Sequence, residues 1–128
     1  MRKVLLCFFL LAVWTGSCTY EQANSPSCGL PDTVSFSRDI QPIFAAHCTD
    51  ISCHTGNMPA GSFNLEPDRA YEELNDPGSG YLDTLQPHIS LLYAQMISVS
   101  TPMPPSGNLD DCTTDLVLKW IEQKAKNN

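Results

Sequence analysis

Residues 48–54, which read CTDISCH, place the tightest constraint on how this 128-residue chain folds. Two cysteines, with a histidine directly after the second, present two thiols and an imidazole from one short loop. This order of groups lets a chain bind the two vinyl groups of a haem covalently and offer a ligand to its iron. Four residues separate the thiols here instead of two, so the loop between them must bulge. The motif predicts a covalent haem site.

Two other interpretations of the motif stay open. In an exported domain, Cys48 and Cys53 would also be close enough in sequence to form a disulfide with each other. A zinc ion would need four nitrogen or sulfur ligands, and Cys48, Cys53 and His54 leave the fourth undefined. Because Cys53 and His54 are adjacent, they are also poorly spaced for a tetrahedral site.

The first 17 residues have the pattern of an export signal. Arg2 and Lys3 precede an apolar run at 4–14, which is too short to remain as a transmembrane helix. The small residues that follow lead directly to Cys18, as in a bacterial lipoprotein cleavage site, although Thr15 stands where Leu is usual. We therefore expect Cys18 to carry a lipid anchor. Ordinary cleavage, with Cys18 as a disulfide partner, is the alternative.

Residues 18–33 are expected to form a flexible tether, because Ser, Pro, Asn and Gly are frequent there. Residues 34–128 would then form one folded domain. Loss of the signal, with its two basic residues, changes the net charge from −7 to −9. This charge argues against binding to nucleic acid and against electrostatic adhesion to anionic lipid. It suits a basic docking partner, although it would equally serve only to keep the domain in solution.

Two cysteines remain, since Cys7 lies in the signal. Outside the cytosol Cys28 and Cys112 are expected to pair. Their disulfide would close a loop of 84 residues and stabilise the fold by on the order of 4 kcal/mol in the chain-entropy model. A free Cys112, buried on a helix face, is the alternative.

Hydrophobic periodicity predicts four short helices. The first, over residues 37–48, has apolar residues at helical spacing and a tolerable proline near its start, so it would deliver Cys48 from its last turn. The second runs from Pro67 to about residue 75, and the third from Ser90, as N-cap, to about residue 98. The last is capped by Asp110, and its apolar face consists of Leu116, Val117, Trp120 and Ile121.

No convincing pair of strands is visible, so the predicted class is an all-α domain with long ordered loops. Loops of this length with so few helical residues would normally count against a compact domain. A bound haem would supply the missing core. Phe44, Tyr71, Tyr93 and Trp120 would either line its pocket or pack as ordinary core.

If both thiols are joined to haem, His54 becomes an iron ligand, and its other ring nitrogen needs an acceptor such as a backbone carbonyl in the following loop. A methionine sulfur would suit the opposite axial position. Met103 is the preferred candidate, because the prolines around it stiffen the backbone.

The competing ligands are weaker. Met58 lies only four residues after His54, so it would reach the opposite haem face awkwardly, and Met96 suits core packing. His47 lies on the apolar stripe of the first helix, where packing is more usual than ligation. His88 lies in a polar loop, where a histidine is most often exposed to solvent.

A family resemblance rests on five segments: SRDIQPIFAAHC, CTDISCH, GSFNL, TPMPPSG and KWIEQKAKNN. Together they resemble the small class I-like monohaem cytochrome c domains of exported Bacteroidota-type lipoproteins, some of which have the wider cysteine spacing. The resemblance covers residues 34–128. It implies one covalent haem c on Cys48 and Cys53, with His54 as proximal and Met103 as distal ligand. The chain departs from the family at Lys124 and Ala125, where members usually show Gly-Ala before the final asparagines.

The expected function is that of a membrane-tethered electron carrier in the periplasm or at the outer membrane. It would act as a monomer with a redox partner protein that the sequence does not identify. No constellation of general acid, base and nucleophile is visible, so we do not expect an independent enzyme. The alternatives are a haem-based gas or redox sensor and a haem-free, disulfide-stapled surface binding module.

Overall fold

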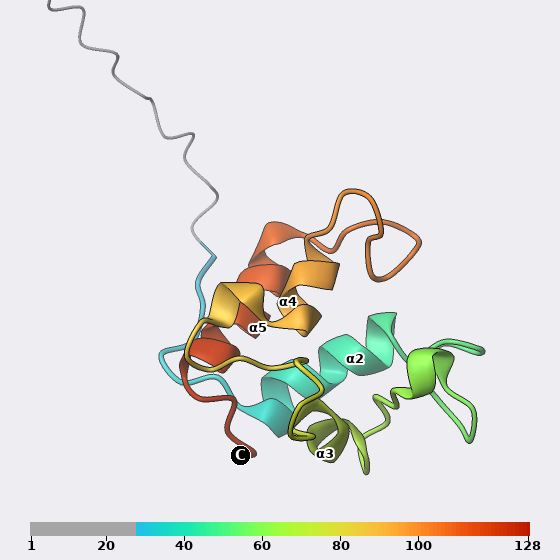
Figure 1. Cartoon of the computed structure of the whole chain (residues 1–128). Helices are drawn as coiled ribbons and strands as arrows, with labels where there is room; N and C mark the ends of the chain where they lie inside the picture. Colours follow the sequence, from blue (N-terminus) through green and yellow to red (C-terminus); the bar gives the residue numbers. More distant parts are fainter. Residues whose placement is uncertain (1–27) are drawn as a thin grey trace, which may run out of the picture.

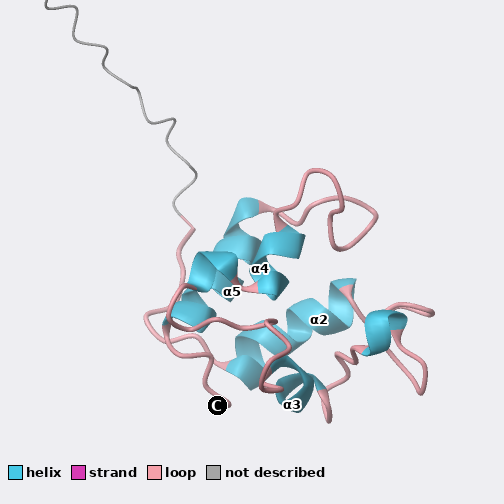
Figure 2. Cartoon of the chain, viewed as in Figure 1, coloured by secondary structure: helices cyan, strands magenta, loops and turns pink. Residues whose placement is uncertain are grey.

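The computed structural model describes residues 28–128, and the regular structure of this part is helical throughout (Figures 1 and 2). It contains the α-helices α2 (Gln41–His47), α3 (Ala70–Leu74), α4 (Leu91–Met96) and α5 (Asp111–Glu122), and the shorter segments η1 (Phe36–Ile40), η2 (Ala60–Ser62) and η3 (Pro87–Ile89). No β-strand occurs within residues 28–128. The predicted all-α class is therefore confirmed. The predicted signal, Cys18 and residues 18–27 of the predicted tether lie outside the described residues.

The first predicted helix is present as η1 followed by α2. Ser35 caps η1, because its side chain accepts a hydrogen bond from the Arg38 N–H. A single wide turn of π-helix then passes into α2, which has Pro42 in its first turn, where a missing N–H does no harm. The helix ends at Cys48, whose N–H donates to the Phe44 carbonyl at 2.8 Å. The first thiol therefore follows directly from the end of α2, as expected.

The second predicted helix begins later than expected. Residues 67–69 form a turn in which Arg69 has a φ of −126°, so α3 starts at Ala70 and not at Pro67. The Ala70 N–H still closes the turn by donating to the Glu66 carbonyl at 2.8 Å. Asn75 ends the helix, as the sequence predicted.

The third predicted helix, α4, is preceded by Ser90 but is not capped by its side chain. The Ser90 hydroxyl is buried and instead accepts a hydrogen bond from the Asp83 N–H at 2.8 Å. The Ser90 side chain therefore stabilises the loop before α4 and does not cap the helix. The helix stops at Met96, with Ile97 as its C-cap, slightly before the predicted end.

The prediction for the last helix is confirmed. The Asp110 carboxylate accepts hydrogen bonds from the Thr113 N–H at 3.0 Å and from its hydroxyl at 2.7 Å, which satisfies a free donor of the first turn. Within the predicted apolar face Val117, Trp120 and Ile121 are buried and Leu116 is partly buried.

Cys112, in the first turn of α5, forms a disulfide with Cys28, and their Cα atoms are 5.3 Å apart. The predicted pairing is confirmed, and the free buried Cys112 is not found. Further along the chain, the Gln123 side chain donates to the Asp32 carbonyl at 2.7 Å and accepts from the Val34 N–H at 2.9 Å. Residues 28–34 are therefore attached to both ends of α5.

The core is built around α5, which packs against η1, η3 and α4. Phe36 is its aromatic centre, because its ring contacts Tyr71, Trp120 and Phe44 at centroid distances of 5.1, 5.3 and 6.4 Å. The Tyr71 hydroxyl donates to the Ala125 carbonyl at 3.0 Å and so joins α3 to the segment after α5. This core fixes the positions of α2 and α4, whose other faces line a cavity.

Candidate functional site

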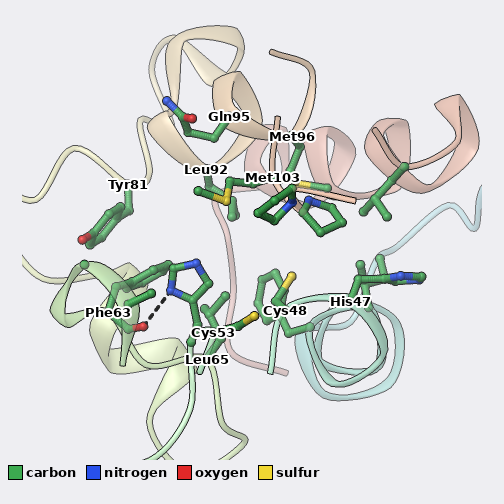
Figure 3. Close-up of a pocket in the computed structure, with 18 of the residues that line it drawn as sticks. His47, Cys48, Cys53, Phe63, Leu65, Tyr81, Leu92, Gln95, Met96 and Met103 are labelled. Atoms are coloured by element: carbon green, nitrogen blue, oxygen red, sulfur yellow. Dashed lines mark hydrogen bonds between the residues drawn. The ribbon is translucent and has the colours of Figure 1, made fainter. Parts of the chain in front are cut away.

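A cavity of about 360 Å³ lies between α2 with the loop that follows it and α4 with the loop beyond it. Figure 3 shows Leu92, Met96 and Met103 on one side, facing Cys48 and Cys53 on the other. No Asp, Glu, Lys or Arg side chain lines the cavity, and most of the lining side chains are apolar. The lining residues are Ile43, Phe44, His47, Cys48, Ser52, Cys53, His54, Ala60, Gly61, Phe63, Leu65, Tyr81, Leu91, Leu92, Gln95, Met96, Met103, Pro104, Pro105 and Leu109.

The two cysteines of the motif are free thiols, and both are half-buried. The alternative in which Cys48 and Cys53 form a disulfide with each other is therefore not found. Burial, with a smaller contribution from the neighbouring Cys53, raises the pKa of the Cys48 thiol to about 11. Cys48 is thus protonated at neutral pH in this environment, and both thiols line the cavity.

The four-residue spacer closes into a compact turn. The Cys53 N–H donates to the Asp50 carbonyl at 2.9 Å, and the His54 N–H donates to the Cys48 carbonyl at 3.0 Å. Ser52 takes up the extra length with a φ of 69°, in the left-handed region that few side chains adopt. The expected bulge is therefore present, and it keeps both thiols and the imidazole beside the same cavity.

His54 is oriented by a backbone carbonyl, as the sequence predicted. Its Nδ1 lies 2.9 Å from the Phe63 carbonyl oxygen, and the dashed line in Figure 3 marks this bond. A carbonyl only accepts hydrogen bonds, so Nδ1 carries a proton, and in the neutral imidazole Nε2 therefore has a free lone pair. His54 is thus held in the tautomer in which Nε2 can bind a metal.

Met103 also lines the cavity, although it is distant from the motif in sequence. Its N–H donates to the Gln95 carbonyl at 3.0 Å, which attaches its loop to α4, and its side chain is 41% exposed. The bond to the next residue, Pro104, is cis, and Pro104 and Pro105 line the cavity beside it.

The competing ligands are placed less favourably than Met103, except for Met96. Met58 is 93% exposed and does not line the cavity, and neither does the exposed His88, whose ring contacts Tyr93. His47 lines the cavity from an exposed position at the end of α2. Met96 is buried in the core, as expected, yet it also lines the cavity.

The four aromatic residues that the sequence left open between pocket and core divide between these two places. Phe44 lines the cavity, whereas Trp120 belongs to the core, and Tyr71 and Tyr93 do not reach the lining. Phe63 and Tyr81, which the sequence did not predict, also line the cavity, and their rings stack at a centroid distance of 4.1 Å. The His54 and Phe63 rings also meet edge to face, with their centroids 5.3 Å apart. No spacing pattern joins Tyr81 to the motif, so the pair becomes apparent only in three dimensions.

Within the described residues, no group of three or more His, Cys, Asp or Glu side chains is arranged to hold a metal ion. In the same part, the helices are too short and too polar to cross a membrane.

Comparison of the chain with protein-family models, with curated proteins and with solved structures gave no match.

Proposed function

We propose that this protein is a membrane-tethered c-type cytochrome that carries single electrons through one covalently bound haem c. In this proposal Cys48 and Cys53 would form the thioethers, and His54 and Met103 would be the ligands of the iron. One observation carries the proposal: these four side chains line the same cavity, although Met103 comes from a separate part of the chain.

The chemistry of the cavity fits this group. The thiols and imidazole come from one compact turn, as attachment requires, and an imidazole nitrogen and a thioether sulfur are ligands that haem iron accepts in electron carriers. The mainly apolar walls, which include no Asp, Glu, Lys or Arg side chain, suit the faces of a flat macrocycle. Gly61, at a φ of 65°, brings backbone without a side chain to the edge of the cavity.

When bound, the haem supplies the one-electron chemistry, and the protein supplies ligation, burial and docking. The hydrogen bond from His54 Nδ1 to the Phe63 carbonyl fixes the ring and raises the basicity of Nε2. The apolar lining would limit water near a bound iron, and the exclusion of water is one of the factors that set a reduction potential. We assign the protein to electron transfer and not to an independent enzymatic reaction.

The predicted export signal and the predicted lipid on Cys18 would hold the domain at the periplasmic side of a membrane or at the outer membrane. The predicted charge of −9 after export suits a redox partner with a basic docking surface. We propose a monomer that meets this partner transiently.

The test is to produce the full chain in cells with and without the machinery that attaches c-type haem. We expect a haem absorption spectrum and a mass increase of one haem that survives denaturation, and we expect Cys48→Ala with Cys53→Ala to lose both. A chain that leaves the maturation system without covalent haem would contradict the proposal and favour the haem-free binding module. Covalent haem that binds carbon monoxide readily and lacks a sulfur-to-iron charge-transfer band would favour the sensor.

A further inference from the structure

The segment directly after His54 is fastened to residues 63–66 by a series of hydrogen bonds. His54 itself makes two of them: Nδ1 donates to the Phe63 carbonyl at 2.9 Å, and its own carbonyl accepts from the Leu65 N–H at 2.8 Å. The residues on both sides of Asn64 therefore contact the proposed proximal ligand. Because Phe63 directly precedes Asn64, contacts that fix Asn64 also help to fix the Phe63 carbonyl, which orients the imidazole.

Asn64 is fully buried and uses both ends of its side-chain amide. Its Nδ2 donates to the Gly56 carbonyl at 3.0 Å and to Glu66 Oε2 at 2.9 Å, and its Oδ1 accepts from the Glu66 N–H at 2.8 Å. A buried polar side chain is stable only when its hydrogen bonds are made, so this amide has little freedom to turn.

The Glu66 carboxylate completes the arrangement. Besides Asn64 Nδ2, it accepts hydrogen bonds from the Thr55 hydroxyl at 2.8 Å and from the Gly56 N–H at 3.1 Å. Hydrogen bonds to an ionised carboxylate are stronger than those between neutral groups. In agreement, the donors on Asn64, Thr55 and Gly56 lower the pKa of Glu66 from its ordinary value.

We propose that Glu66 and Asn64 are positioning residues for His54. Together they hold the Phe63 carbonyl against Nδ1 and so fix the tautomer that leaves Nε2 as the ligating nitrogen. The effect on the imidazole stands on the hydrogen bonds alone, whereas the effect on iron rests on the proposed function. In the haem-loaded protein, a firmly held Nδ1–H makes the ring a stronger donor, which favours ferric iron and lowers the reduction potential.

The fold should tolerate a change in this cluster, because the same segment has a second attachment. The Gln41 side chain, from the start of α2, donates to the Leu65 carbonyl at 3.0 Å. Loss of the Glu66 charge should therefore loosen the Phe63 carbonyl without unfolding the domain.

The test is nitrogen NMR of the histidine rings in the full-length protein, labelled with ¹⁵N-histidine. The protein is measured as purified, and if it carries haem it is first reduced to the ferrous state. In the wild type we expect His54 to show a protonated Nδ1 and an unprotonated Nε2 only. Glu66→Gln should shift the His54 Nδ1 signal and speed the exchange of its proton with water, and in protein without haem it should also give a mixture of the two tautomers. Glu72→Gln is the matched control, because it removes one negative charge from an exposed side chain of α3 that is not part of the Glu66 cluster. It should leave the His54 signals unchanged.

The reduction potential supplies a second measurement, and we expect it to rise in Glu66→Gln. Loss of a negative charge would by itself raise the potential, so Thr55→Val is the decisive variant, since it removes one donor to Glu66 without changing the charge. It should shift the His54 signals and the potential in the same direction, by less than Glu66→Gln does. Unchanged His54 signals in both variants, even with lower stability, would overturn the proposal. If the chain carries no haem, the NMR result still decides the positioning role, while the proposed function fails separately.

Discussion

Cys28 and Cys112 form a disulfide that joins the start of the described chain to the first turn of α5. Gln123, just beyond the other end of the same helix, binds Asp32 and Val34 through its side chain. Residues 28–34 are thus covalently attached at one end of α5 and hydrogen-bonded at the other. Because α5 carries much of the core, this attachment should matter for the stability of the whole domain.

Replacing Cys28 and Cys112 together by Ser should lower the free energy of unfolding by about 2–5 kcal/mol, because the unfolded chain regains the freedom of a loop of 84 residues. Guanidinium unfolding of the variant and the wild type measures the difference. As a control, a reducing agent should destabilise the wild type by a similar amount and leave the variant unaffected. Equal unfolding midpoints for the two proteins would show that the disulfide contributes little.

The Trp120 side chain should contribute more than any exposed apolar group. It is completely buried against Phe36, and its ring N–H donates to the Lys126 carbonyl at 3.0 Å. Trp120→Ala should therefore lower the free energy of unfolding by about 3–5 kcal/mol. Val99→Ala, at a side chain that is 95% exposed, is the control and should change it by about 0.5 kcal/mol or less. A small effect at Trp120 would contradict the assignment of the core.

The helices that the sequence predicted best are those whose ends are decided locally. Asp110 and its donor Thr113 are three residues apart, so the cap of α5 could be recognised from the sequence. The Ser90 hydroxyl has the same chemistry but bonds to Asp83 instead. That choice depends on how the loop before α4 packs, which no local pattern records. The later start of α3, at Ala70 and not at Pro67, likewise had no sequence signal.

The candidate site was also predicted only where its groups are close together in the sequence. CTDISCH could be recognised because its groups are adjacent, and an acceptor for the His54 ring was expected on chemical grounds. That this acceptor belongs to Phe63 depends on the path of the loop. Asn64 and Glu66 were missed, because an Asn two residues before a Glu is unremarkable until the chain folds back onto Thr55. The distal side was predicted from the proline-rich setting of Met103, whereas the stacking of Phe63 on Tyr81 had no sequence signal.

The cap of α5 should make stability depend on pH in the acidic range. Hydrogen bonds from the Thr113 hydroxyl and the Thr113 N–H lower the pKa of the Asp110 carboxyl from its ordinary value. A carboxyl whose pKa is lower in the folded state stabilises the fold above its unfolded pKa, and this contribution disappears as the pH falls through the folded pKa.

Asp110→Asn keeps an oxygen for the Thr113 N–H but has no charge to lose. The difference in urea unfolding midpoint between wild type and variant should therefore be larger at pH 7 than at pH 2. Thr113→Val should raise the pKa of Asp110 in an NMR titration, because it removes the hydroxyl donor. A difference between wild type and Asp110→Asn that does not vary with pH would contradict the role of the charge.

Met103 should be the sulfur ligand of the haem-loaded protein, because it lines the cavity from the side opposite the cysteines (Figure 3). Met103→Ala should abolish the sulfur-to-iron charge-transfer band and raise the affinity for carbon monoxide, since an axial position becomes open. Met58→Leu is the matched control and should keep the band, because Met58 is exposed and away from the cavity. Met96→Leu tests the other methionine that lines the cavity and should also keep it. A band that survives Met103→Ala but is lost in Met96→Leu would transfer the ligand role to α4, and the loop that holds Met103 would then only cover the cavity.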